Sequence, residues 1–379
     1  MKRSLFFLLV IAIGFSACKS GKKAYQQGDY REAVYKALNR LKSSPDNDKA
    51  AGILQSAYPA LVSYMEDQIS QENLTRSPLK HEKIMDMYES LNAVYDEIQR
   101  TPSARNLIPD ARSYRRQAEN AKAQAIEVRY ALGLEEMETG YREDAIEAHR
   151  NFERVMELDP NYKDVEEKMG EALAMATLWV EVPEIPMHSI RYKVSANFFE
   201  SQVQEFLRSA SISPYVRFLG PEVRGGRAPK PDHRLEMRFE DFVVGQVYQR
   251  EIQAERVKDS VVIGTVKVRD TTLNRYGSVK GTLMGFEKEI SSTGILSVAI
   301  VDTRTKAILT RQEFPGSFIW YDYWGYVEGD KRALNDDDLK YIDKKRPAPE
   351  PDSQTLFVEF TRPIFDQVTG FLDEYYERY

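Results

Sequence analysis

The spacing of apolar residues changes along the chain and divides it near residue 180. Over residues 22–180 apolar side chains recur at intervals of three and four, alanine is frequent and proline is sparse, which is typical of successive amphipathic helices. Two prolines within residues 183–186 disfavour helix and mark a boundary, beyond which β-branched residues dominate. The pattern predicts an α+β multidomain protein, with a helical domain over residues 18–182 and a mostly antiparallel α+β domain over residues 187–379.

Two stretches of the helical region share one spacing. In the first, Gly28–Asp29 turns one helix into the next, Ala33 permits close approach of the two helices, and Pro45 ends the second helix. After a turn at Gly140–Tyr141, the second stretch repeats the spacing at Ala148, Phe152, Val155 and Asp159–Pro160. Both stretches resemble the tetratricopeptide repeat, and this resemblance implies a small, irregular solenoid. A generic antiparallel helical bundle is the alternative.

Longer helices without the repeat spacing are predicted between the two stretches, near residues 49–68, 78–99 and 108–138. In the second half, the alternation and turn signals predict strands at residues 189–194, 215–219, 235–242, 257–269, 278–288, 294–302 and 306–314. Helices are predicted at residues 198–209 and 356–379, with a loop over residues 220–232 and a hairpin turn at Asp302–Lys306. The phrase over residues 294–309, following the strand that begins at Leu235, resembles envelope lipoprotein domains of the curli-secretion-channel type.

The first eighteen residues carry a targeting pattern. A basic start, Met1–Arg3, precedes an apolar run from Leu5 to Phe15 that is too short to span a bilayer, and Ser16–Ala17 precedes Cys18. The pattern resembles the bacterial lipobox, with Phe15 where leucine is usual. The resemblance implies cleavage of residues 1–17 and attachment of acyl chains, palmitate among them, to the Cys18 thiol. A plain signal peptide and a buried free thiol are the alternatives.

The residues after Cys18 indicate which side of the membrane the chain faces. Residues 19–23 are basic, whereas acidic residues at this place are associated with export to the cell surface in the Bacteroidetes-like lipoproteins that the chain resembles. Their absence favours a chain anchored in the outer membrane and facing the periplasm.

Composition excludes several function classes. A formal net charge of −6 argues against nucleic acid as a partner, because such binding needs a concentrated basic surface. Cys18 is the only cysteine, so its lipidation leaves no thiol for a disulfide or a metal, and the four histidines are too scattered for a metal site. Nucleophile-elbow, zinc-helix and phosphate-loop motifs are absent from the sequence. We therefore expect no cofactor, no metal and no catalytic residue.

Two acidic groups have structural explanations. Asp336–Asp338 is typical of a helix start, where the positive end of the helix dipole favours carboxylates. Glu240 and Asp241 are adjacent on a predicted strand and would point to opposite faces, so they cannot converge on one substrate atom.

Residues 314–326 hold seven aromatic residues in thirteen positions. Such residues pack a core, anchor a protein interface or stack on sugar rings, and the sequence leaves these three readings open. Strand alternation would place Tyr321 and Tyr323 outside. The interface candidates are Phe318, Trp320, Tyr321, Tyr323, Trp324 and Tyr326.

These features together predict a non-catalytic, membrane-anchored envelope lipoprotein. We expect it to act as a scaffold or adaptor that binds an envelope protein complex, in outer-membrane or cell-wall assembly. The lipid at Cys18 would hold it to the membrane and raise its effective concentration near the partner. The alternative function is glycan binding by the aromatic segment 314–326.

Overall fold

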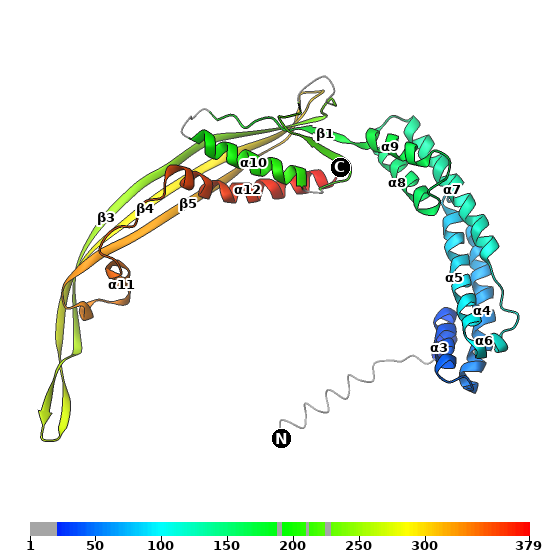
Figure 1. Cartoon of the computed structure of the whole chain (residues 1–379), viewed down its shortest axis with the longest axis horizontal. Helices are drawn as coiled ribbons and strands as arrows, with labels where there is room; N and C mark the ends of the chain where they lie inside the picture. Colours follow the sequence, from blue (N-terminus) through cyan, green and yellow to red (C-terminus); the bar gives the residue numbers. More distant parts are fainter. Residues whose placement is uncertain (1–20, 188–191, 210–211, 224–228) are drawn as a thin grey trace. The chain divides into compact units, whose positions relative to one another are not determined.

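The computed structural model describes residues 21–187, 192–209, 212–223 and 229–379 (Figure 1). It divides into two compact units between Ala176 and Thr177, here named the helical unit and the sheet unit. The fold is thus helical in its first half and α+β in its second, which confirms the coarse layout expected from the sequence. Cys18 and the signal segment 1–17 lie outside the described residues.

The described helical unit consists of helices that pack mainly against their neighbours in the sequence. Helix α3 packs on α2 and α4, α5 on α4 and α7, and α8 on α7 and α9. At the predicted turn, Gly28 takes a φ of 79° and the Asp29 carboxylate caps α3 by accepting from the Glu32 N–H, 3.1 Å away. The helices are α2 (Gly21–Gln26), α3 (Tyr30–Ser43), α4 (Asp48–Asn73), α5 (Lys80–Arg100), α6 (Pro102–Leu107), α7 (Arg115–Glu138), α8 (Arg142–Leu158) and α9 (Val165–Ala176).

Small side chains and one charged network hold α5, α7 and α8 together. Gly133 of α7 lies directly under the Phe152 ring of α8, so that a Cβ there would come within 2.7 Å of the ring. Glu82 of α5 accepts hydrogen bonds from Arg129 of α7 and Arg154 of α8. Burial would raise the pKa of Glu82, but the two guanidinium groups outweigh it and lower that pKa.

The sheet unit contains one five-stranded sheet in the order β2-β1-β3-β4-β5. Strand β1 pairs in parallel with β2 and β3, whereas β3, β4 and β5 are antiparallel. The strands are β1 (Leu178–Glu181), β2 (Val216–Leu219), β3 (His233–Val268), β4 (Thr271–Asp302) and β5 (Ile308–Gly329). The helices are α10 (Lys193–Ser209), the 3-10 turn η2 (Lys331–Ala333), α11 (Asp336–Ile342) and α12 (Ser353–Glu377).

Several predicted elements differ from the structure. The short strands expected between residues 235 and 314 merge into β3, β4 and β5, and register shifts in β3 absorb the glycines and polar residues that resembled turns. Lys193 and Val194, predicted as strand, begin α10, and the helix expected up to residue 180 ends at Ala176, before β1. The predicted turn at residues 302–306 is confirmed, because the Asp302 carboxylate accepts from the Arg304 and Thr305 N–H groups.

The two faces of the sheet carry different covers. On one face, α10 and α12 enclose the large core, which includes Leu296 of β4 and Phe314 of β5. Gly316 on the same face of β5 permits the contact with α12, because a Cβ there would lie 2.3 Å from the Phe360 carbonyl. The opposite face carries α11, whose Tyr341 ring lies against Gly285 of β4.

A strap connects the two covers. Residues 343–352, named the strap here, join α11 to α12 and pass along the outer edge of β5. The Gly325 N–H donates to the Lys344 carbonyl at 3.0 Å, and the Ala348 N–H donates to the Asp322 carboxylate at 2.7 Å. The Lys344 ammonium also donates to Asp322. These bonds fix the strap to β5.

Candidate interaction surfaces

The aromatic segment 314–326 lies within β5, so its side chains alternate between the two covered faces. Phe314 packs against Phe371 of α12, and Phe318 joins the edge of the same core. Trp324 is buried and stacks on Phe286 of β4, with ring centroids 5.5 Å apart, while Trp320 is partly buried. Most of these rings therefore pack within the sheet unit.

The exposed rings of this segment are Tyr321 and Tyr326. Tyr321 lies beside Tyr323 at 6.3 Å between nearly parallel rings, and the negative charge of Glu289 raises the pKa of Tyr321. Tyr323, expected outside, is half covered because Tyr341 of α11 meets its ring edge-on and Lys340 lies over its face. The six interface candidates thus form no common exposed platform.

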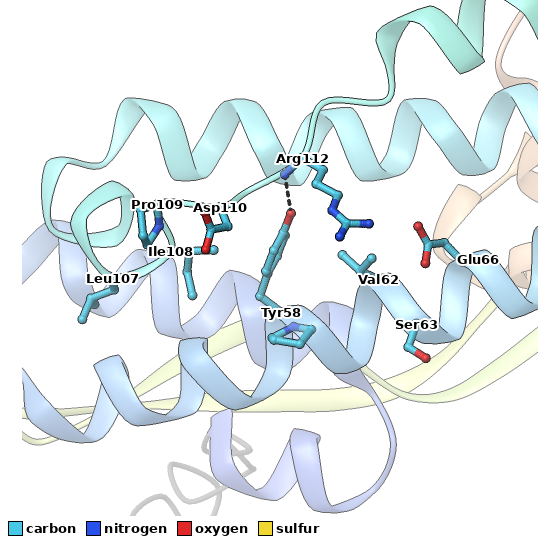
Figure 2. Close-up of a pocket in the computed structure, with 10 residues that line it drawn as sticks. Tyr58, Val62, Ser63, Glu66, Leu107, Ile108, Pro109, Asp110 and Arg112 are labelled. Atoms are coloured by element: carbon cyan, nitrogen blue, oxygen red, sulfur yellow. Dashed lines mark hydrogen bonds between the residues drawn. The ribbon is translucent and has the colours of Figure 1, made fainter.

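A groove in the helical unit was not predicted from the sequence (Figure 2). It has a volume of about 420 Å³ and lies between α4 and the loop that joins α6 to α7. Val62, Leu107 and Ile108 supply apolar side chains, and Arg112 and Asp110 supply charges. Its size and mixed lining are typical of sites that bind a small molecule or a few residues of a peptide.

Two buried side chains fix the loop that forms one wall of the groove. The Arg112 N–H donates to the Tyr58 hydroxyl at 3.0 Å (Figure 2), and the Tyr114 N–H donates to the Asn92 side-chain carbonyl at 2.7 Å. Burial raises the pKa of Tyr58, so this hydroxyl stays protonated at neutral pH. The Tyr114 hydroxyl donates to Glu66 at 2.8 Å, which ties the loop to α4 a second time.

The charged side chains of the groove differ in what they contact. Glu66 accepts from Tyr114, whereas the exposed Arg112 guanidinium makes no ion pair with any described residue and points along α4 toward Val62 and Glu66 (Figure 2). Its main-chain N–H is fixed, so the start of its side chain is held in place. A guanidinium in this position can bind a carboxylate in a bidentate manner.

The sequence contains one indirect signal for this groove. Pro59 lies within α4 and cannot donate to the carbonyl four residues before it. The helix predicted over residues 108–138 begins only at Arg115, because residues 108–114 are held by Tyr58 and Asn92 instead. Pro59 lies inside a helix, and Pro102 and Pro109 bracket the connection opposite it. This combination of prolines indicates irregular backbone at the groove.

A third surface is the end of the β3–β4 ribbon. The last residue pair of β5 joins Gly329 to Gly281, so residues 257–280 continue as two strands alone (Figure 1). We name residues 257–280 the distal hairpin. η2 contacts the base of this hairpin, and beyond the base the hairpin exposes several aliphatic side chains.

In the described part of the chain, His, Cys, Asp and Glu side chains form no group of three or more suited to a metal ion. Asp338 serves instead in the N-terminal cap of α11 and in an ion pair with Arg256. None of the helices in the described ranges is long and apolar enough to cross a membrane.

No protein-family model and no curated protein matches this chain. Among solved structures, it is similar to a neuraminyllactose-binding hemagglutinin homolog from Helicobacter pylori. The sequence identity is 15%, the match covers 53% of this chain and 91% of that chain, and the TM-score is 0.24. A likeness at that score says nothing about the function of this chain.

Proposed function

We propose that this chain is a non-catalytic, membrane-anchored envelope lipoprotein that acts as a protein–protein adaptor. The observation that carries the proposal is the groove between α4 and the α6–α7 loop. It combines a fixed wall, apolar side chains and the Arg112 guanidinium, which has no ion-pair partner among the described residues. An extended segment of a partner protein, with an apolar side chain next to a carboxylate, matches these groups.

The arrangement of the helices supports the same function. The paired helices α2–α3 and α7–α8, with their turns at Gly28 and Gly140, carry the spacing that resembles the tetratricopeptide repeat, and such repeats expose extended binding surfaces. The described residues of the helical unit form small hydrophobic cores that follow one another along the chain. Each of these cores is formed by helices that are close in sequence. In this proposal the helical unit is a solenoid of imperfect repeats that presents the groove to its partner.

The N-terminal pattern supplies the membrane part of the proposal. Acylation of Cys18 would hold the chain to the outer membrane on its periplasmic side. A tethered adaptor needs only weak contacts, because its effective concentration near a membrane complex is high. Assembly of the outer membrane or cell wall is the setting that fits a periplasmic adaptor.

Site-specific crosslinking in intact cells tests the proposal. A photoreactive residue at Ser63, which lines the groove and is exposed, should form an adduct with a defined envelope protein. The same residue at Ser56, exposed on α4 but outside the groove lining, is the matched control. Arg112→Glu should reduce the yield of the Ser63 adduct at least tenfold. A loss of binding of about this size is expected when a hydrogen bond between two charged groups is removed.

The outcomes of this experiment separate the parts of the proposal. Equal adducts at both positions, or an adduct that survives Arg112→Glu, would contradict a partner in the groove. The Arg112 side chain does not make the bond to Tyr58, so this variant should keep the melting curve of the helical unit. Cys18→Ser should release the chain from the membrane fraction, and continued attachment would contradict the lipid anchor.

The structure gives no specific observation in favour of glycan binding. Trp324 is buried against Phe286 and Trp320 is partly buried, so neither offers an open ring face of the kind that stacks on sugars. Glycan binding by residues 314–326 therefore stays a prediction from sequence alone.

A further inference from the structure

The distal hairpin is contacted at its base by η2, where Arg332 donates to the Val262 carbonyl at 2.6 Å, and beyond this base no other described element covers it. A two-stranded ribbon alone is marginally stable in water, and three strands or a packed face are needed for independent stability. Here only cross-strand pairs hold residues 261–268 to residues 271–277. A long ribbon of this kind gains stability if something packs on its apolar face.

One face of the distal hairpin is aliphatic. Val266 and Leu273 are cross-strand partners, with 48% and 52% of their surfaces exposed. Ile263 lies over Gly277 on the same face, since a Cβ at Gly277 would come within 2.6 Å of its Cδ1 atom. Val268, 51% exposed, continues this face toward the tip. We name this set of side chains the aliphatic face.

The distal hairpin is also basic in an acidic protein. It holds five basic and two acidic residues, a formal net charge of +3, whereas the whole chain has a net charge of −6. Alternation along β4 places Arg275 on the aliphatic face beside Leu273, and Arg269 lies at the tip. The basic residues are Lys258, Lys267, Arg269, Arg275 and Lys280.

We infer that the aliphatic face of the distal hairpin docks on an anionic lipid surface. Exposed aliphatic side chains bordered by lysine and arginine suit the boundary between acyl chains and negatively charged headgroups, where apolar burial and electrostatic attraction act together. The net positive charge of the hairpin favours an anionic lipid surface as its binding partner. The rest of the chain is acidic and would repel an anionic surface.

The depth of this contact follows from the backbone. Both outer edges of the hairpin carry main-chain N–H and C=O groups that are paired with no other described strand. Such groups are costly in the hydrocarbon core, so the hairpin lies among the headgroups and does not cross the bilayer. This contact is separate from the partner groove, and neither proposal depends on the other.

Vesicle binding tests the inference with the chain from residue 21 onward, which keeps every described element and lacks both signal and lipid. Co-sedimentation would compare vesicles of phosphatidylcholine alone with vesicles that contain roughly one third phosphatidylglycerol. We expect binding to the anionic vesicles only, and its loss in high salt. Equal binding to both kinds of vesicle, or binding to neither, would overturn the inference.

Matched variants locate the contact. Leu273→Ala should weaken binding about tenfold, since it removes three carbons that are each worth about a fourfold factor when buried, and about half of this side chain, 52% exposed, is available for burial. Val247→Ala, on β3 outside the hairpin and equally exposed at 51%, should leave binding unchanged. Arg275→Glu should weaken binding roughly 25-fold, at about fivefold for each unit of charge, whereas Arg31→Glu in the helical unit should not.

A second occupant would give a different result. If two copies of the chain pair through this face, sedimentation without vesicles will show a dimer that Leu273→Ala dissociates, and the lipid inference is then wrong. If the hairpin variants bind anionic vesicles as tightly as the unaltered chain, another surface makes the contact and the inference also fails.

Discussion

The two ends of the β3–β4 pair are built from similar residues but have different surroundings. At the covered end, β3 alternates strictly between buried and exposed positions, and α12 packs on the buried set. At the distal hairpin the pairing continues, yet residues 262–268 of β3 are all exposed. The same alternation therefore produces a core at one end and a bare apolar face at the other.

This difference teaches that cross-strand pairing and core formation are separable in this sheet. Hydrogen bonds and cross-strand contacts extend the ribbon, but free energy from apolar burial requires a second layer. The second layer ends where α11 and η2 end, near the last residue pair of β5. Beyond that point, aliphatic residues add little to the stability of the fold and are free to serve an interaction.

The largest expected effect compares two leucines on one strand. Leu296→Ala removes a side chain that is fully buried and should lower the free energy of unfolding of the sheet unit by about 2–5 kcal/mol. Leu273→Ala, on the same strand in the distal hairpin, should change it by about 0.5 kcal/mol or less. Denaturant unfolding followed by tryptophan fluorescence measures both, because Trp179, Trp320 and Trp324 all lie in the sheet unit.

Equal losses in the two variants would break the comparison, since they would mean that the distal hairpin is covered as well as the core is. An unchanged transition for Leu296→Ala would show that α12 does not pack on β4 as described.

A smaller effect concerns the strap that holds the covers in place. Asp322→Ala removes the acceptor for Lys344 and for the Ala348 N–H, and leaves that N–H without its partner. We expect a loss of about 2 kcal/mol, below the range for a fully buried pair because the Lys344 side chain is 41% exposed. Asp343→Ala, an exposed neighbour in the strap, is the control and should have little effect on the same fluorescence transition.

The smallest expected change in the free energy of unfolding concerns the Arg256–Asp338 pair, which lies between the covered end of the β3–β4 pair and the distal hairpin. Arg256 binds the Asp338 carboxylate with two hydrogen bonds, at 2.7 and 2.9 Å, and these bonds lower the pKa of Asp338 below its ordinary value of 3.8. Because the folded-state pKa is lowered, the pair stabilises the fold above pH 3.8 and is lost as the pH falls through the lowered pKa.

Asp338→Asn should therefore cost about 1 kcal/mol at neutral pH and flatten the decline of stability in acid. Asparagine keeps a side-chain oxygen that can accept from the Asn335 N–H, so the capping box of α11 should persist while the charge is lost. Asp337→Asn is the exposed control. If the acid profile of Asp338→Asn matches that of the unaltered chain, this pair does not hold α11 to the border.

Elements set by local sequence were predicted well. The helices near residues 49–68 and 78–99 correspond to α4 and α5, and the closing helix corresponds to α12, since their apolar periodicity is a local property. The turn at Asp302 was predictable because its carboxylate caps the turn within three residues. Local spacing also predicted the turns at Gly28 and Gly140, both of which take positive φ values.

Elements set by distant partners were not predictable from the sequence. The continuity of β3 depends on its long pairing with β4, which carries the strand through Gly245 and the rest of the gap between the strands predicted at residues 235–242 and 257–269. The cover on Tyr323 comes from α11, and the partners of Asp322 come from the strap. The groove likewise joins residues 58–66 to residues 107–112, and the prolines of the two segments do not by themselves show that these segments contact each other.

The strap has a consequence for how far this sheet can grow. An open edge strand has unpaired N–H and C=O groups that can pair with a strand of another molecule, and this makes the edge a site for aggregation. The bond from Gly325 to Lys344 occupies that edge near one end of β5, and Pro315 removes a donor farther along the same strand. Any strand added by another molecule would therefore meet fewer obstacles on the β3 side, so growth of the sheet has a built-in direction.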